Sequence, residues 1–212
     1  MTSLPGPLGD AAAAARRGEL IVFPTDTVYG IGTRPDVPTA TDRLFEAKQR
    51  PRELELPVLV PTVGIARSVA VLDGRAERLA AALWPGPLTL VLPRSADASG
   101  WDLGGDPARV GVRVPHHPLA LALLAETGPL AVTSANHSGR PPARTCDELH
   151  ASFEDRVAVY VCQDLPLDGV ASTVLDLAHG PATIVRQGSL GREVLIELLP
   201  DERSLLDSPP SS

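Results

Sequence analysis

The sequence predicts an α/β domain built on a mixed β-sheet. Short apolar segments typical of buried strands alternate with helical segments, and some of these strands are separated by loops alone. In addition, 22 prolines and 18 glycines interrupt the 212-residue chain throughout, which indicates short elements joined by many turns. A chain of this length forms one sizeable core by default. We therefore expect one domain over residues 1–200 and a polar tail over residues 201–212.

Apolar periodicity, together with proline and glycine positions, gives the expected elements. Asp10 can cap the first helix and Gly18 can end it, while Arg50-Pro51 ends the second. The expected helices span residues 11–17, 38–49, 75–83, 118–127, 145–152 and 192–199. The expected strands span residues 20–23, 57–60, 88–92, 110–114, 130–133, 157–162, 172–177 and 182–185. Residues 95–107 are rich in Gly, Asp and Ser and are expected to form a surface loop.

The composition argues against several classes of protein. A net charge of −7 with 3% aromatic residues is a poor match to a sequence-independent nucleic-acid binder. We expect no signal peptide, because residues 1–10 lack a basic region followed by an apolar run, and no apolar run of the sequence reaches the roughly 18 residues of a membrane span. Two cysteines, Cys146 and Cys162, are too few for a disulfide framework or a zinc site. We expect them to be reduced structural thiols, and we expect a cytoplasmic protein that does not enter a membrane.

The first polar cluster follows a buried strand, residues 20–23. Pro24 lacks an N–H and ends strand pairing, and hydroxyl and carboxylate groups follow it at once. The cluster consists of Thr25, Asp26, Thr27 and Tyr29, with Gly30 and Gly32 able to adopt positive φ or to approach a ligand closely. By itself this segment is compatible with a capped polar turn or with a binding site.

Two further clusters are cationic. Lys48, the single lysine of the chain, and Arg50 stand at the end of a predicted helix. There they could simply complement the helix dipole, or they could clamp a polyphosphate. Arg113 stands between Val112 and Val114 and points to the opposite face of its strand. That face is either solvent or a concave site in which a guanidinium binds a carboxylate or phosphate.

A fourth cluster follows the predicted strand 130–133. Thr133-Ser134-Ala135-Asn136, with Ser138-Gly139, could form helix caps and turns or could cradle phosphate oxygens. Ser172 and Arg186 are weaker candidates at the ends of the last two strands. The chain contains no Walker A loop and no nucleophile elbow. Its five histidines lack metal-ligand spacing.

Taken in order, these segments resemble the L-threonylcarbamoyladenylate synthase family, whose domain is of the YrdC type. The resemblance covers about residues 10–198. It rests on Pro24–Gly30, Lys48-Gln49-Arg50-Pro51, Trp84–Thr89, Val112–Pro115 with His117-Pro118, Thr133–Gly139, Ser172–Asp176 and Val185–Gly188.

The resemblance implies a twisted α/β sheet with a large, locally positive concave cavity. It also implies a reaction in which L-threonine, bicarbonate or CO2, and ATP give threonylcarbamoyl-AMP and pyrophosphate. A separate tRNA threonylcarbamoyl transferase complex would use the product to modify the adenosine next to the anticodon. Mg2+ would arrive with ATP and not on protein side chains. Direct tRNA binding would be weak.

The family's functional positions map onto residues of this chain. The resemblance implies that Lys48 and Arg50 are catalytic and hold the triphosphate, with Ser134, Asn136 and Arg186 also on ATP. It implies that Thr27, Tyr29, Arg113, Thr133 and Ser172 contact L-threonine. On the residues alone, Asp26 is expected to do no more than hold its turn.

The chain departs from the family pattern in two places. It resembles the short, single-domain form, and its segment Arg52–Leu56 is more apolar and acidic than the polar loop expected there. Two other functions stay open at this point. One is a carbamoyl-adenylating domain of the hydrogenase-maturation type, which normally accompanies cysteine clusters absent here. The other is an RNA-binding module.

Overall fold

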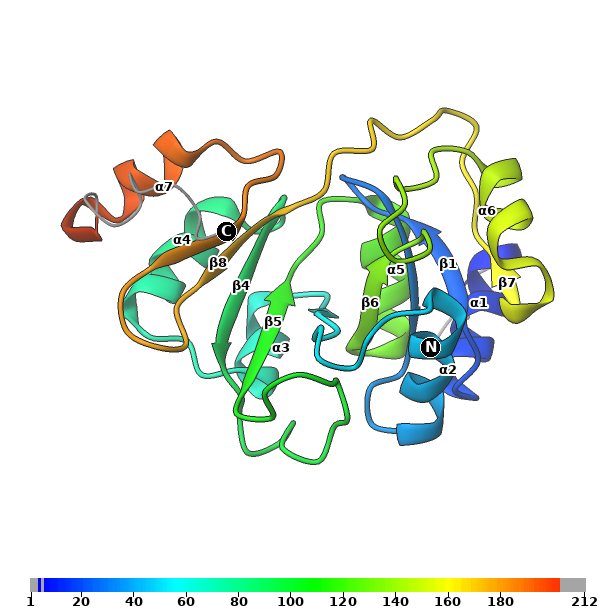
Figure 1. The fold of residues 1–212 in the computed structure, drawn as a ribbon, viewed down its shortest axis with the longest axis horizontal. Coiled ribbons are helices and arrows are strands. Elements are labelled where there is room, and N and C mark those ends of the chain that lie inside the picture. Colours follow the sequence, from blue (N-terminus) through cyan, green and yellow to red (C-terminus); the bar gives the residue numbers. More distant parts are fainter. Residues whose placement is uncertain (1–3, 5, 203–212) are drawn as a thin grey trace.

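A single nine-stranded sheet organises the described part of the chain, which is residue 4 and residues 6–202 of a computed structural model. The strand order is β7-β1-β2-β6-β3-β5-β4-β8-β9 (Figure 1). The strands are β1 (Ile21–Pro24), β2 (Tyr29–Thr33), β3 (Val58–Leu59), β4 (Leu88–Pro93), β5 (Arg109–Arg113), β6 (Leu130–Ser134), β7 (Val159–Tyr160), β8 (Thr173–Asp176) and β9 (Thr183–Arg186). Because β1 and β2 are antiparallel while β3 and β5 are parallel, the sheet is mixed. The predicted α/β fold with a twisted mixed sheet is confirmed.

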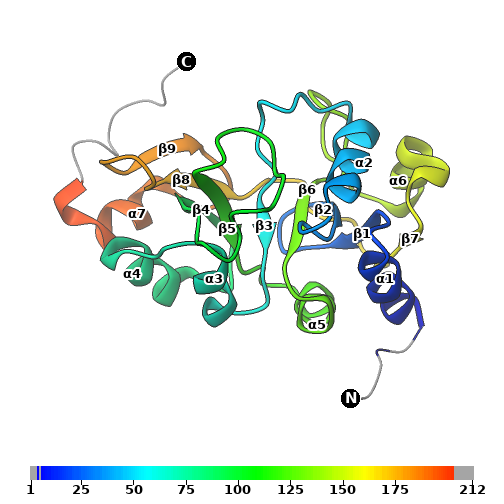
Figure 2. The ribbon, with the colours of Figure 1, turned by 90° about the horizontal axis from the view of Figure 1, so that it is seen from below.

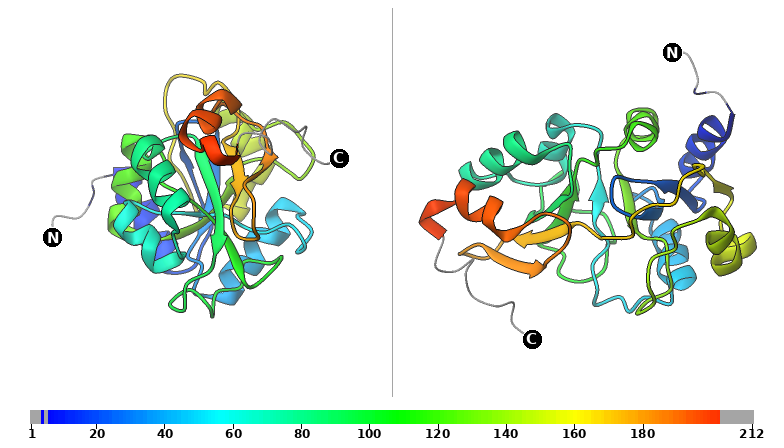
Figure 3. Two further views of the ribbon diagram at one scale, coloured as in Figure 1. Left: turned by 90° about the vertical axis from the view of Figure 1, so that its left-hand side faces the viewer. Right: turned by 90° about the horizontal axis from the view of Figure 1, so that it is seen from above.

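Helices cover both sides of this sheet (Figure 3). Figure 2 shows α1, α3, α4 and α5 along one side and α2 and α6 on the other. The helices are α1 (Gly6–Arg16), α2 (Pro38–Lys48), α3 (Val63–Val69), α4 (Gly74–Leu83), α5 (Pro118–Thr127), α6 (Cys146–Phe153) and α7 (Arg192–Leu198), with short 3-10 helices at Glu154–Arg156 and Pro200–Glu202. Among the described residues, no helix combines the length and apolar character that crossing a membrane requires.

The small side chains of α1 let it pack closely. Ala11, Ala12, Ala14 and Ala15 are buried in one core cluster with Leu123 and Leu124 of α5. A second, larger cluster fills the other layers and includes β4, β5 and α4. The abundance of alanine, leucine and valine in place of aromatic residues thus still yields two continuous apolar layers.

Strand β2 is an element that the sequence did not predict, because its residues Tyr-Gly-Ile-Gly-Thr resemble a loop. It pairs with both β1 and β6. Neither Gly30 nor Gly32 has a positive φ. Instead, a Cβ at Gly30 would lie 2.6 Å from Val132, and one at Gly32 would lie 2.7 Å from the Ala131 carbonyl and from Val132. The glycines are therefore required by the close approach of β6.

Several boundaries also differ from the expectation. Helix α1 begins at Gly6 and not after Asp10, and α3 was not predicted, although Thr62 caps it by accepting a hydrogen bond from the backbone N–H of Ile65. Strand β7 is shorter than the expected residues 157–162. Glu202, placed in the expected tail, lies in a 3-10 helix and forms an ion pair with Arg75 at 2.7 Å. Asp201 lies in the same 3-10 helix, and residues 203–212 of that tail lie outside the described residues.

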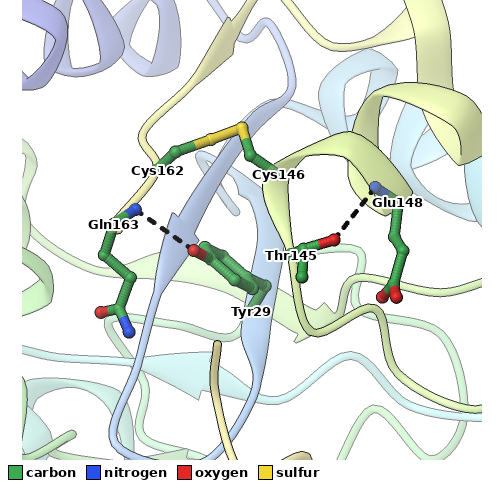
Figure 4. The surroundings of a disulfide bond; sticks show 6 residues. All are labelled: Tyr29, Thr145, Cys146, Glu148, Cys162 and Gln163. Carbon is green, nitrogen blue, oxygen red and sulfur yellow. Dashed lines mark hydrogen bonds between the residues drawn. A yellow bond between two sulfur atoms is a disulfide. The ribbon is translucent and has the colours of Figure 1, made fainter. Parts of the chain in front are cut away.

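Cys146 and Cys162 form a disulfide bond with a Cα–Cα distance of 5.8 Å (Figure 4). The expectation of two reduced thiols is therefore wrong. Residue counting could not reveal that the start of α6 returns to the end of β7, which brings two cysteines 16 residues apart into contact. The cysteines consequently give no support to a reducing compartment.

This disulfide should contribute measurably to stability. A cross-link closing a loop of about 15 residues is worth roughly 3 kcal/mol in the chain-entropy model. For a chain of this size that corresponds to a decrease in Tm of roughly 6–12 °C. We expect Cys162→Ser to lower the Tm by that amount in differential scanning calorimetry, and Cys146→Ser to match it. An unchanged Tm in both variants, or in wild type after addition of reductant, would contradict the cross-link.

Candidate functional site

A cavity of about 510 Å³ is lined by residues of β4, β5 and β8, among them Thr89, Arg113 and Asp176, and by residues of the adjoining loops. The β1–β2 turn, the segment after α2 and the end of β6 contribute its walls. Seven of the ten predicted site residues line it: Thr27, Arg50, Arg113, Thr133, Ser134, Ser172 and Arg186. Motifs separated by more than 150 residues in the sequence therefore meet in one cavity.

Arg113 is the most buried cation of the cavity wall, with 5% of the residue exposed. Its Nε donates to the Gly86 carbonyl and its Nη1 to Thr27 Oγ1, both at 3.0 Å, while its Nη2 pairs with Asp26 at 2.5 Å. Burial lowers the pKa of Arg113, and the Asp26 carboxylate opposes that shift. These contacts hold the guanidinium at a fixed place and leave two of its five N–H groups without a partner in the described structure.

Asp26 does more than hold the turn. Its Oδ1 accepts from Arg113 and, at 2.9 Å, from the backbone N–H of His116. The turn itself is held by Thr25, whose hydroxyl donates to the Val28 carbonyl at 2.6 Å. A carboxylate two residues after a strand could have been matched to Arg113 in advance, because a buried guanidinium requires an anionic partner.

Arg50 and Arg186 bring two more cations to the cavity. Arg50 donates to the carbonyls of Leu54 and Glu55, at 3.0 and 2.8 Å. Arg186 donates to the carbonyl and the hydroxyl of Ser172, at 3.0 and 3.1 Å. Burial lowers the pKa of both, and the charge of Arg186 further lowers the pKa of Arg50. Two guanidinium groups that repel each other in one cavity form a site that an anion would stabilise.

Lys48 lies behind this cavity and not on its surface. Only 1% of the residue is exposed, and its Nζ donates to the backbone carbonyls of Ser134 and Asn136. Burial lowers its pKa to about 7, and the charge of Arg50 contributes in the same direction. The side chain thereby ties the end of α2 to the segment that carries Ser134.

A third group of charges lies in the same cavity. Arg109 of β5 pairs with Glu55 at 2.6 Å and with Asp176 of β8 at 3.0 Å. All three residues line the cavity. No sequence motif indicated this triad in advance. The only related sequence feature was the acidic character of segment 52–56, which includes Glu55 but does not indicate its partners.

Comparison with known proteins agrees with this arrangement. The family model Sua5_yciO_yrdC, described as "Telomere recombination", matches residues 13–188. The chain belongs to the Sua5/YciO/YrdC family.

Relatives with functional names support the membership. The threonylcarbamoyl-AMP synthase of Bacillus subtilis is 35% identical over 188 residues, which are 88% of this chain and 54% of the relative. That of Escherichia coli O1:K1 is 40% identical over 154 residues, 68% of this chain and 80% of the relative. The chain thus spans about half the length of the longer relative and most of the shorter one. A transferase-type activity in tRNA modification is supported by these names.

Solved structures of the family have the same fold. Pyrococcus abyssi Sua5 in complex with L-threonine aligns with a TM-score of 0.83 and 33% identity over 94% of this chain and 60% of that one. Escherichia coli YciO aligns with a TM-score of 0.81 and 25% identity over 89% and 93%. A nucleotide-bound HypF reaches 0.73 at 19% identity over 87% of this chain and 29% of that one, which shows likeness of fold alone.

Three of the ten predicted site residues, Lys48, Tyr29 and Asn136, do not line the cavity. Lys48 lies behind it, as described above. The Asn136 side chain donates to the His137 carbonyl at 2.9 Å and so holds its own loop. Tyr29 is fully buried, and its hydroxyl accepts from the backbone N–H of Gln163 at 3.2 Å, next to the disulfide (Figure 4). Tyr29 thus supports the fold at this point, and its contact with L-threonine stays a prediction.

The depressed pKa of Lys48 leads to a prediction about stability. Between about pH 7 and pH 10.5, a lysine of this kind is protonated in the unfolded chain and neutral in the folded one. The unfolded state then binds more protons, so stability rises with pH by up to about 1.4 kcal/mol per pH unit. Below about pH 7 both states are protonated and this gain is absent.

Lys48→Met should remove that dependence. We expect the difference in unfolding free energy between wild type and the variant to shift in favour of wild type as pH rises from 7 to 10. Urea titrations at several pH values measure it. Arg43→Met, on the same helix, is the control and should leave the slope unchanged. Parallel pH profiles for wild type and Lys48→Met would contradict the shifted pKa.

Proposed function

We propose that this chain is an L-threonylcarbamoyladenylate synthase, a nucleotidyltransferase that makes threonylcarbamoyl-AMP and pyrophosphate from L-threonine, bicarbonate or CO2, and ATP. The observation that carries the proposal is a single cavity lined by three guanidinium groups. Arg113 is held in place and has two unused N–H groups, and Arg50 and Arg186 form no ion pair within the described residues. The first suits a single carboxylate and the other two suit a polyphosphate.

Arg113 would bind the carboxylate of L-threonine. Three of its five N–H groups are already used by Gly86, Thr27 and Asp26. The remaining two lie one on each terminal nitrogen, which allows a two-pronged contact with two carboxylate oxygens. Thr27, Thr133 and Ser172 line the same cavity and would offer hydroxyl groups to the amino acid.

Arg50, Arg186 and Ser134 would hold the triphosphate of ATP. Lys48 would act as a positioning residue, because its ammonium reaches the carbonyls of Ser134 and Asn136 from behind the cavity wall. In the reaction, the amine nitrogen of threonine attacks the carbon of CO2 and loses a proton, which gives a carbamate. A carbamate oxygen then attacks the α-phosphorus, the bond to the bridging oxygen breaks, and pyrophosphate leaves. Fixed cations favour this step by stabilising the charge that develops on the phosphates.

Mg2+ would arrive with the nucleotide and would add charge neutralisation on the phosphates when bound. The groups at the proposed phosphate end are guanidinium and hydroxyl groups, which suit phosphate oxygens better than a divalent cation. Among the residues that the structure describes, no group of three or more His, Cys, Asp or Glu side chains could hold a metal ion.

The product would be consumed by a tRNA threonylcarbamoyl transferase complex, and we propose that tRNA itself contacts this chain weakly at most. Threonylcarbamoyl-AMP is a mixed anhydride, so its carbamoyl carbon is activated for transfer to an amine. The net charge of −7 gives the chain no general attraction for a polyanion. We further propose that the chain works in the cytoplasm, where its substrates are found.

Pyrophosphate release tests the proposal directly. With L-threonine, bicarbonate and ATP all present we expect release, and we expect it to stop when any one is left out. Arg50→Ala and Lys48→Ala should reduce the rate at least 100-fold, the first through lost charge stabilisation and the second through the displaced Ser134 segment. Release that does not need threonine, no release with all three, or full activity in either variant would overturn the assignment.

Arg113→Lys separates amino-acid binding from nucleotide binding. A lysine keeps the charge but cannot make two parallel hydrogen bonds, so the KM for L-threonine should rise roughly 10- to 100-fold. The affinity for ATP alone, measured by isothermal titration calorimetry, should stay within about threefold, because Arg113 is assigned to the amino acid. An unchanged threonine KM would remove Arg113 from the binding site.

A further inference from the structure

Besides its arginines, the cavity contains a carboxylate, Glu55, that has no role in the proposed reaction. Arg50, Arg113 and Arg186 all line the cavity, and the charge of Arg186 lowers the pKa of the other two. Arg50 in turn donates to the Glu55 backbone carbonyl at 2.8 Å. Glu55 then pairs with Arg109. The cationic region is thus followed directly by a carboxylate.

The Glu55 carboxylate is held in place through one of its two oxygen atoms. Its Oε1 pairs with Arg109 at 2.6 Å, and its side chain is 16% exposed. Within the described residues, no hydrogen bond involves its second oxygen. Asp176 differs, because one of its oxygens pairs with Arg109 and the other accepts from the backbone N–H of Ala178 at 2.8 Å. Glu55 is therefore the member of the triad that offers a free acceptor to the cavity.

Arg109 acts as the brace of this carboxylate. It joins Glu55 on the segment after α2 to Asp176 on β8. The segment is also fixed from its other side, where the backbone N–H of Leu56 donates to the Leu103 carbonyl at 2.8 Å. The Glu55 carboxylate thus has a defined position beside Arg50, although it lies on a loop.

We propose that Glu55 accepts a hydrogen bond from a ribose hydroxyl of the nucleotide and thereby distinguishes ATP from its deoxy analogues. This inference rests on the proposed function. In ATP the ribose is the group attached directly to the α-phosphate, so it must lie next to the cations that hold the phosphates. A carboxylate is an effective acceptor for a ribose 2′-hydroxyl, as in dinucleotide-binding domains. The phosphates themselves would be repelled by Glu55, which fixes the direction in which the nucleotide enters.

Nucleotide affinity measured by isothermal titration calorimetry tests this inference without any turnover. The probes are ATP, 2′-deoxyATP and 3′-deoxyATP, each with Mg2+. Since a hydrogen bond to a charged group is worth about 10- to 100-fold in affinity, wild type should prefer ATP over at least one deoxy analogue by at least tenfold. Glu55→Gln and Glu55→Ala should shrink that preference to threefold or less, mainly by weakening the binding of ATP.

Glu53→Gln is the matched control. Glu53 lies on the same segment, has an exposed side chain and forms no ion pair within the described residues. The substitution therefore removes one negative charge, as Glu55→Gln does, without breaking the contact with Arg109. It should keep the wild-type preference. Equal affinities of wild type for all three nucleotides, or the same preference in wild type and both Glu55 variants, would overturn the inference while leaving the proposed function intact. Failure of wild type to bind ATP would overturn both.

Discussion

The burial of Arg113 is the constraint on which the rest of the site depends. A guanidinium taken out of water needs a nearby anion and hydrogen-bond acceptors, or the structure pays a large desolvation penalty. Asp26, Thr27 and the Gly86 carbonyl meet that need from two segments far apart in the sequence. The tip of the β1–β2 turn is thereby pinned against β5. One ion pair thus holds part of the cavity wall and fixes the cation that would bind the amino acid.

An acidic chain can still build a cationic cavity, because net charge says little about local potential. Several surface arginines are paired with carboxylates close by, such as Arg67 with Glu77 and Arg34 with Asp36. Arg50 and Arg186 instead donate to carbonyl and hydroxyl oxygens, which are neutral. Neither guanidinium forms an ion pair within the described residues, although the charge of Glu55 acts on Arg50, so both remain available to a ligand. The net charge of −7 therefore does not prevent four arginines from lining one cavity, with Glu53, Glu55 and Asp176 as its acidic residues.

Polar groups at strand ends were the part of the site that sequence could predict. Thr27, Arg113 and Ser172 follow or end apolar runs, and a strand that ends in polar residues directs them to an edge. Strand β2 was missed because its two glycines resemble a loop, whereas they are required by the packing of Val132. The disulfide and the pairing of Glu55 with Arg109 were missed for a common reason: each depends on where distant segments meet, which local pattern does not encode.

The single lysine of the chain occupies a buried position whose contacts suit an ammonium group. Lys48 Nζ converges on the two backbone carbonyls of Ser134 and Asn136, a geometry that suits a compact ammonium with rotatable donors. A planar guanidinium would need more space and would direct its donors outward. Arginine also keeps its proton under all conditions, whereas the pKa of Lys48 falls to about 7 through burial. At this position the lysine both joins two segments by hydrogen bonds and carries a charge that depends on its surroundings. These two properties are a physical reason for a lysine here in a chain whose other cationic side chains are arginines.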